Sequence, residues 1–241
     1  MPTLLHAAIN GDRRHPATPR TPEEIAAEAR AAVAAGAVSV HLHPYGPDGR
    51  HTLAAEPSAA ALRATRAACP GVPISLSTSA AIERDPRKRQ ALVAAWTELP
   101  DLATANQGEE GIVELCELLL DRGVGIEAGL LEVGDAQAFV ASGLAPRCTR
   151  AMVEPLDLDP ATAVAHGARI EAVLAGAGIG IEQAHHGDGI ASWAVNERAI
   201  RRGHSIRTGL EDTPVLPDGR QASGNGELIR AAAALVAAAS A

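Results

Sequence analysis

The chain has 241 residues, of which 46% are hydrophobic and 21% are charged, and its mean hydropathy is close to zero. This composition is typical of a globular protein and excludes a disordered, collagen-like or coiled-coil chain. The formal charge of -8 offers no positive field for a nucleic-acid backbone, so nucleic acid is excluded as a partner. We expect one domain over residues 1–241, because α/β barrels commonly reach this size without dividing.

Other features of the composition narrow the class of protein further. Aromatic residues make up only 2% of the chain, too few for base stacking or for a membrane-interface belt, so the core should be aliphatic. No apolar run approaches the roughly 18 residues of a membrane span, and the start lacks a signal-peptide pattern, which together predict a cytoplasmic protein without membrane contact. Cys69, Cys116 and Cys148 are odd in number and widely separated, which predicts reduced, mostly buried thiols. Lys88 is the only lysine and lies in a charged run, which argues against Schiff-base chemistry.

Short β-like runs alternate with helical patterns along the whole chain. The predicted strands are 3–9, 37–43, 73–78, 102–106, 124–129, 147–153, 179–185 and 204–209. The predicted helices are 22–35, 57–68, 86–96, 109–122, 135–142, 160–175, 190–202 and 226–239. Eight strands with helical crossovers predict an α/β fold of the (β/α)₈ TIM-barrel type. An open doubly wound sheet is the alternative, which the lack of a GxGxxG motif after the first strand disfavours.

The clearest helix start follows the first predicted strand. In Thr21-Pro22-Glu23-Glu24 the threonine can accept from first-turn amides, proline suits the first helical position, and Glu24 can reach back to the cap. This pattern predicts a capping box at Thr21.

Polar residues gather where the predicted strands end, which is where TIM barrels place their active sites. In His41-Leu42-His43, residues two apart on a strand point to the same face, so both imidazoles can converge on one ion. With one carboxylate they would form a site suited to Zn²⁺, Fe²⁺ or Mn²⁺. The alternative is a pair of polar residues at a strand end without a metal.

A second motif, Arg207-Thr208-Gly209-Leu210-Glu211-Asp212, closes the last predicted strand. In a closed barrel this strand neighbours the first ones, so Glu211 could be the third metal ligand. Asp212, paired with Arg207, would then stay ionised and serve as a base. The alternative is a salt-bridged strand end.

Together these segments resemble the β-keto acid cleavage enzymes, whose best-known member cleaves 3-keto-5-aminohexanoate. The likeness runs nearly end to end. Its anchors are Ala8-Ile9-Asn10-Gly11, Thr21 to Ile25, Ala35-Gly36-Ala37, His41-Leu42-His43, Gly203 to Asp212, and Asn225-Gly226-Glu227-Leu228. The resemblance implies a TIM barrel that binds Zn²⁺ through His41, His43 and Glu211 and forms a homo-oligomer, a tetramer or a dimer. It also implies a retro-Claisen exchange in which a β-keto acid and acetyl-CoA give acetoacetate and a new acyl-CoA.

The resemblance also implies roles for other residues. Asp212, held by Arg207, would remove a proton, and Glu127, placed after the fifth strand, would help to organise the site. The residues implied to contact the keto acid are Asn10, Ser77, Thr78, Ser79, Thr104 and Asn106. Each hydroxyl among them could equally be a turn or cap residue.

The chain departs from the family pattern at several positions. Tyr45 stands where an arginine is usual, Ala80-Ala81 stands where Gly-Gly is frequent, and the stretch from Ala80 to Thr97 is short. These departures leave two alternatives open: a metal-dependent barrel hydrolase or aldolase that uses no CoA, and a barrel that binds a ligand or partner without catalysis.

Overall fold

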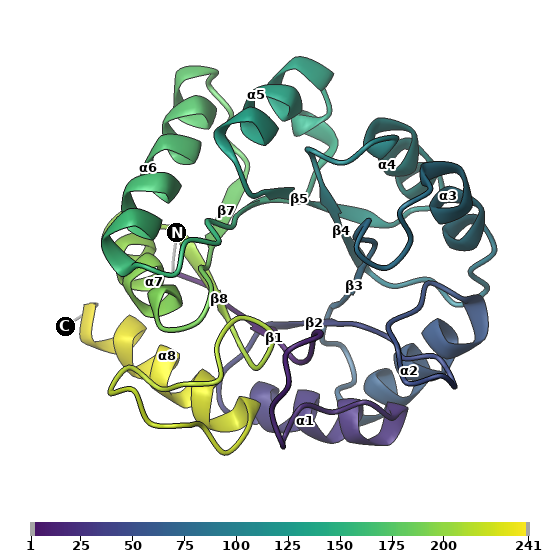
Figure 1. Cartoon of the computed structure of the whole chain (residues 1–241), viewed down its shortest axis with the longest axis horizontal. Coiled ribbons are helices and arrows are strands. Elements are labelled where there is room, and N and C mark those ends of the chain that lie inside the picture. The colour runs from purple at the N-terminus through teal and green to yellow at the C-terminus, as the bar shows by residue number, and fades with distance from the viewer. Residues whose placement is uncertain (1–2, 240–241) are drawn as a thin grey trace.

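In a computed structural model, which describes residues 3–239, eight parallel strands close into a barrel that is surrounded by helices (Figure 1). The strands are β1 (Leu5–Ala8), β2 (Ser39–Leu42), β3 (Ile74–Ser77), β4 (Leu102–Asn106), β5 (Gly125–Leu130), β6 (Arg150–Val153), β7 (Glu182–His185) and β8 (Ser205–Thr208). The helices are α1 (Pro22–Ala34), α2 (Ala55–Ala68), α3 (Pro86–Ala94), α4 (Ile112–Asp121), α5 (Val133–Ser142), α6 (Pro160–Gly176), α7 (Ala191–Arg201) and α8 (Asn225–Ala239). The predicted TIM barrel is confirmed.

Closure of the barrel brings the two sequence motifs together. β1 pairs with β2, where Ala8 lies opposite His41, and with β8, where Ala7 lies opposite Thr208. The carboxyl ends of the second and last strands therefore flank that of the first. Residues 41–43 and 207–212, far apart in the chain, meet at this rim.

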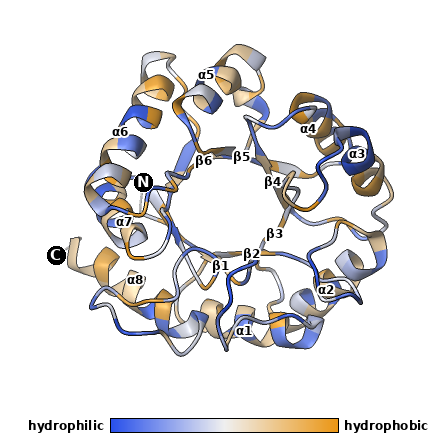
Figure 2. Ribbon diagram, viewed as in Figure 1, coloured by the Kyte–Doolittle hydropathy of each residue, from blue (hydrophilic) through white to orange (hydrophobic). Residues whose placement is uncertain are grey.

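Most predicted elements lie where the sequence indicates; β4 has the predicted bounds and β5 the predicted length, and the other strands are shorter than expected. The capping box is present at α1: the Glu24 amide donates to the Thr21 hydroxyl, and the Glu24 carboxylate accepts from the Thr21 amide. The sixth strand was expected from Arg147, but a 3₁₀ turn over Ala145–Arg147 delays it to Arg150. Figure 2 shows helices with both hydrophobic and hydrophilic residues, and α3 as mainly hydrophilic.

The aliphatic core predicted from composition lies between the strands and the helices, with Ile25, Leu62 and Leu119 among its fully buried members. The inside of the barrel is polar. Arg150 of β6 contacts His6 of β1, and these strands are not neighbours, so the contact crosses the barrel interior. The prediction of an aliphatic core is therefore wrong for the inside of the barrel.

The three cysteines are buried and make no disulfide, and burial raises the pKa of the Cys116 thiol to about 11. None of the helices within residues 3–239 has the length and apolar character that a membrane crossing requires.

Candidate metal centre and active site

Three side chains from the joined strand ends form the candidate metal centre. Nε2 of His41 lies 3.6 Å, and Nε2 of His43 lies 3.5 Å, from Oε2 of Glu211. One possible ligand atom from each residue lies within 4.8 Å of the others. Such a triangle suits a single ion with bonds of about 2.0–2.2 Å to each atom.

Unsatisfied buried atoms show that these residues fit a metal. Among residues 3–239, Nε2 of His43 and Oε2 of Glu211 are buried without a hydrogen-bond partner, which would be unfavourable in a site that held no ion. Burial lowers the pKa of His41 to about 3, so its imidazole is neutral and keeps a lone pair for an ion. Burial raises the pKa of Glu211, but Arg207, His41 and His43 outweigh it and hold that pKa well below its ordinary value.

A hydrogen-bonded chain beneath the centre orients His41. Nδ1 of His41 lies 3.2 Å from Oγ of Ser75, and the Ser75 hydroxyl donates to the Glu127 carboxylate. Ser75 must therefore accept from Nδ1, which leaves Nε2 of His41 unprotonated and facing Glu211. Glu127 in turn lies 3.3 Å from Nε of Arg150. Glu127 was expected after the fifth strand but lies within β5, one level below the rim.

Asn10 holds the second histidine through the backbone. Its Oδ1 accepts from the His43 amide at 2.8 Å, and its Nδ2 donates to the carbonyls of His43 and Pro19. With these bonds its amide is fully engaged, which favours a positioning role over the implied contact with substrate. Gly11, the next residue, leaves room for Glu211: a Cβ there would lie 2.8 Å from Glu211 Cγ.

The acid–base part of the site lies beside the candidate metal ligands. Arg207 donates to Asp212 through two nitrogens, at 2.6 and 3.2 Å, and to Glu211 at 3.2 Å. Nδ1 of His186 lies 3.3 Å from Asp212, and its Nε2 lies 3.2 Å from Glu154. Burial raises the pKa of Asp212 above its ordinary value, although Arg207 and His186 both act to lower it.

His186 and Glu154 directly follow β7 and β6, and the sequence motifs assign neither of them a role. Burial and Arg207 lower the pKa of His186, but Asp212 and Glu154 together raise it above the ordinary value. The neighbouring His185 faces away from the site and stacks on His204, with ring centroids 4.7 Å apart. Only one of the adjacent histidines enters the site, as strand alternation requires.

Arg13 contributes to the site in a way that the sequence did not indicate. Its guanidinium donates to the carbonyls of Glu211 and Asp212, at 3.2 and 3.3 Å, and to the Asp188 carboxylate. It therefore ties the loop after β8 to the loops after β1 and β7. Nothing in its local sequence separates it from a surface arginine.

The residues implied to contact the keto acid differ in their placement. Ser77 and Thr104 are buried opposite each other on β3 and β4, whereas Thr78 donates its hydroxyl proton to the Thr104 carbonyl at 2.6 Å. Ser79 and Asn106 both contact Glu109, which Arg89 holds from α3 at 2.8 Å. The Ser77 hydroxyl accepts only a long bond of 3.4 Å from the Ser79 amide, and the Thr104 hydroxyl makes no hydrogen bond within residues 3–239, while the other three are largely committed to protein groups.

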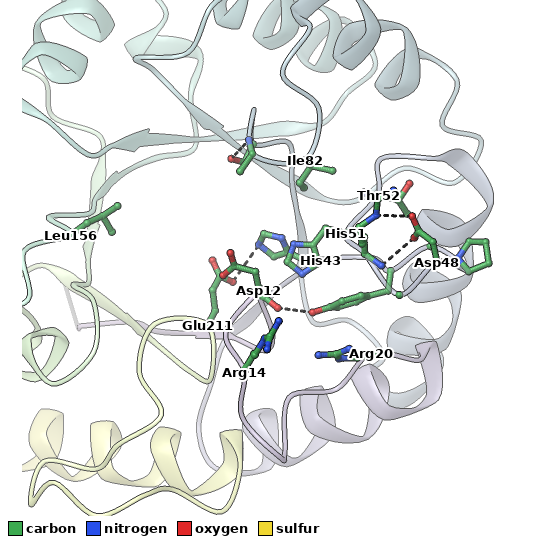
Figure 3. A pocket seen from close by; sticks show the side chains of 18 residues that line it. Asp12, Arg14, Arg20, His43, Asp48, His51, Thr52, Ile82, Leu156 and Glu211 are labelled. Carbon is green, nitrogen blue, oxygen red and sulfur yellow. Dashed lines mark hydrogen bonds and ion pairs between the residues drawn. The ribbon is translucent and has the colours of Figure 1, made fainter.

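A cavity of about 1030 Å³ opens from the candidate metal centre toward solvent (Figure 3). His43 and Glu211 lie at its inner end in the view, and Tyr45 and His51, from the loop after β2, line its wall. Ile82 and Leu156 add apolar surface. The cavity offers space for an acyl chain beside the candidate ligands.

The sequence model of the beta-keto acid cleavage enzyme family matches residues 2–241. The chain belongs to this family. A 3-keto-5-aminohexanoate cleavage enzyme of Fusobacterium nucleatum subsp. nucleatum is 29% identical over 243 residues, covering 94% of this chain and 88% of the relative. One from Acetoanaerobium sticklandii is 28% identical over 151 residues, covering 60% of this chain and 51% of the relative. The resemblance inferred from the motifs is confirmed.

Solved structures of ObcA are similar to this beta-keto acid cleavage enzyme family member in fold. The ternary complex of ObcA with a C4-CoA adduct and oxalate superposes with a TM-score of 0.72 at 18% identity, covering 93% of this chain and 65% of that one. The complex of ObcA with oxaloacetate superposes with a TM-score of 0.68 at 18% identity, covering 90% of this chain and 63% of ObcA. The chain thus spans less than two thirds of the length of ObcA.

Proposed function

We propose that this protein exchanges the acyl group of a β-keto acid with acetyl-CoA, giving acetoacetate and a new acyl-CoA. The exchange balances: the bond between the keto carbon and the CH₂ carbon breaks, the acyl group passes to the CoA sulfur, and the acetyl group passes to the CH₂-carboxylate. The observation that carries the proposal is the convergence of His41, His43 and Glu211 beside the Arg207–Asp212 pair. Family membership and the keto acid and CoA ligands named for ObcA support it.

His41, His43 and Glu211 would hold a divalent ion, which we propose is Zn²⁺. When bound, such an ion supplies Lewis acidity for the negative charge that develops on a ketone oxygen during cleavage. Ser75 keeps His41 in the tautomer required for this role, and Asn10 fixes the backbone of His43.

Asp212 is the proposed base for the acidic CH₂ group of the keto acid. Arg207 fixes the orientation of its carboxylate, and His186 offers a second contact on the same oxygen. A carboxylate held in this way needs little reorganisation when it accepts a proton. Ser77 and Thr104 are proposed to bind keto-acid oxygens, and Glu127 supports the site through Ser75.

Metal analysis and a substrate panel test this proposal. We expect about one zinc per chain, and acetoacetate plus a new acyl-CoA from at least one β-keto acid incubated with acetyl-CoA. Zinc without acetoacetate would move the assignment to a hydrolase or aldolase that uses no CoA. Absence of both zinc and turnover would favour a barrel without catalysis.

A pair of adjacent substitutions separates metal binding from proton transfer. Glu211→Gln should lose the metal and the activity together. Asp212→Asn should keep the metal and lower kcat roughly 100-fold to 10,000-fold, the range for removal of a general base. Zinc content measured on both purified variants gives the comparison, and zinc retained in Glu211→Gln at wild-type affinity would contradict the ligand assignment.

A further inference from the structure

Two arginines that line the cavity have no carboxylate partner. Within residues 3–239 the guanidinium groups of Arg14 and Arg20 make no hydrogen bond or ion pair. By contrast, Arg50 on the same cavity wall pairs with Asp48 at 2.8 Å. Arg14 and Arg20 are both exposed and line the cavity, so their N–H donors are available to a solute that enters it.

Ring contacts link Arg20 to the candidate metal centre. Its guanidinium carbon lies 5.6 Å from the ring centroid of Tyr45, whose hydroxyl donates to the Gly11 carbonyl at 2.6 Å. The Tyr45 ring lies 4.5 Å from that of His51, which in turn lies 4.6 Å from that of His43. This series of contacts holds the Arg20 guanidinium in place relative to His43, while its N–H donors make no hydrogen bond within residues 3–239.

The charges around the cavity leave a positive balance at this wall. Glu211 is engaged by Arg207, and Asp48 is engaged by Arg50. Asp12 is then the one acidic lining residue without an ion pair among the described residues, and it lines the same cavity as the two free arginines. Figure 3 shows Arg14 and Arg20 on the same side of the cavity, with Ile82 across from them.

We propose that Arg14 and Arg20 form a subsite for an anionic oxygen group of a substrate, distinct from the carboxylate that lies next to the cleaved bond. Arginine binds carboxylate and phosphate oxygens through paired donors, so either chemistry fits. The group can come from a distal carboxylate of the keto acid or from a phosphate of CoA. Naming the keto acid and CoA as the two sources rests on the proposed function, in which both are substrates.

Matched keto acids distinguish the two sources. 3-Oxohexanedioate and 3-oxohexanoate have the same chain length and differ by a terminal carboxylate in place of a methyl group. If the keto acid supplies the anion, Arg20→Gln and Arg14→Gln should each raise KM for the diacid by roughly tenfold, the loss of about one charge-assisted hydrogen bond. KM for 3-oxohexanoate and for acetyl-CoA should then stay unchanged. If CoA supplies the anion, KM for acetyl-CoA rises instead and both keto acids are unaffected.

Calorimetry without turnover makes the subsite testable on its own. Zinc-loaded protein is titrated with 3-oxohexanedioate and, separately, with adenosine 3′,5′-bisphosphate. One probe should bind the wild-type protein, bind each arginine variant more weakly, and bind Asp12→Asn more tightly. The double variant Asp48→Asn/Arg50→Gln is the matched control, because it removes a paired guanidinium from the same cavity without changing the net charge, and it should bind as wild type does.

The possible outcomes separate this proposal from the function on which it rests. Arginine-dependent binding of a probe without turnover of any keto acid would support the subsite and contradict the acyl exchange. Binding of neither probe, or an equal loss in the charge-neutral control Asp48→Asn/Arg50→Gln, would overturn the subsite whatever the activity.

Discussion

Ser75 shows how a residue outside the candidate ligand set can control it. Its oxygen accepts from Nδ1 of His41 while its proton goes to Glu127, so one hydroxyl fixes both the ring orientation and the tautomer. Second-layer contacts of this kind usually contribute about 10-fold to 100-fold to metal affinity. Local sequence could not reveal this role, because Ser75 lies in the middle of β3 and reaches Glu127 on β5, past the intervening strand β4.

Ser75→Ala should therefore weaken zinc binding by roughly 10-fold to 100-fold, because Nδ1 of His41 loses its acceptor. Competition with a chelator measures the affinity directly. Ser58→Ala is the control: Ser58 is equally buried but lies in α2, and its hydroxyl makes no hydrogen bond to any residue that the structure describes. Equal zinc affinities for the two variants would show that Ser75 does not act on the metal through His41.

At the scale of elements, the sequence predicts the order of strands and helices well because hydrophobic periodicity and helix caps are local signals. The capping box at Thr21 and the His-x-His pair on one strand are both found as expected. The features that the sequence did not predict arise from tertiary contacts between residues far apart in the chain. Arg13 contacts the loop after β8 nearly 200 residues along the chain, and Arg150 fills a barrel interior that composition alone suggested would be aliphatic.

The junction between β8 and β1 depends on close backbone approach at Gly209. A Cβ at this position would lie 1.9 Å from the carbonyl oxygen of Ala8. β8 cannot move away without shifting the loop that carries Glu211 and Asp212. The sequence motif thus contains a glycine for a packing reason that becomes visible only once the barrel closes.

Gly209→Ala should destabilise the fold by about 3 kcal/mol, the upper part of the range for overpacking, and should also weaken zinc binding by displacing Glu211. Urea unfolding and chelator competition measure the two effects. Gly134→Ala is the control, since Gly134 lies in α5 with no atom near its missing Cβ, and it should be neutral or slightly stabilising. A Gly209→Ala variant as stable as wild type would contradict this packing argument.

At the scale of the whole molecule, two clusters of ion pairs join different strands and helices of the barrel. Glu182 of β7 meets His6 of β1 and Arg150 of β6 inside the barrel. Glu171 of α6 receives hydrogen bonds from Arg198 and Arg202 of α7 on the outside. Burial raises the pKa of each glutamate, but the basic partners outweigh it and lower the pKa of both to about 2.

These depressed pKa values predict an acid-sensitive fold. A carboxyl group whose pKa is lower in the folded state stabilises the protein above its unfolded pKa, near 4.5, and loses that contribution as the pH falls toward 2. Glu171→Gln should lower the free energy of unfolding at pH 7 by about 3 kcal/mol, because it leaves two arginines without their buried partner. Urea unfolding between pH 3 and pH 7 should show the gap between wild type and variant constant from pH 7 to about pH 5 and narrowing below it. A gap of equal size at every pH would mean that the lost stability comes from packing around Glu171 and not from its charge.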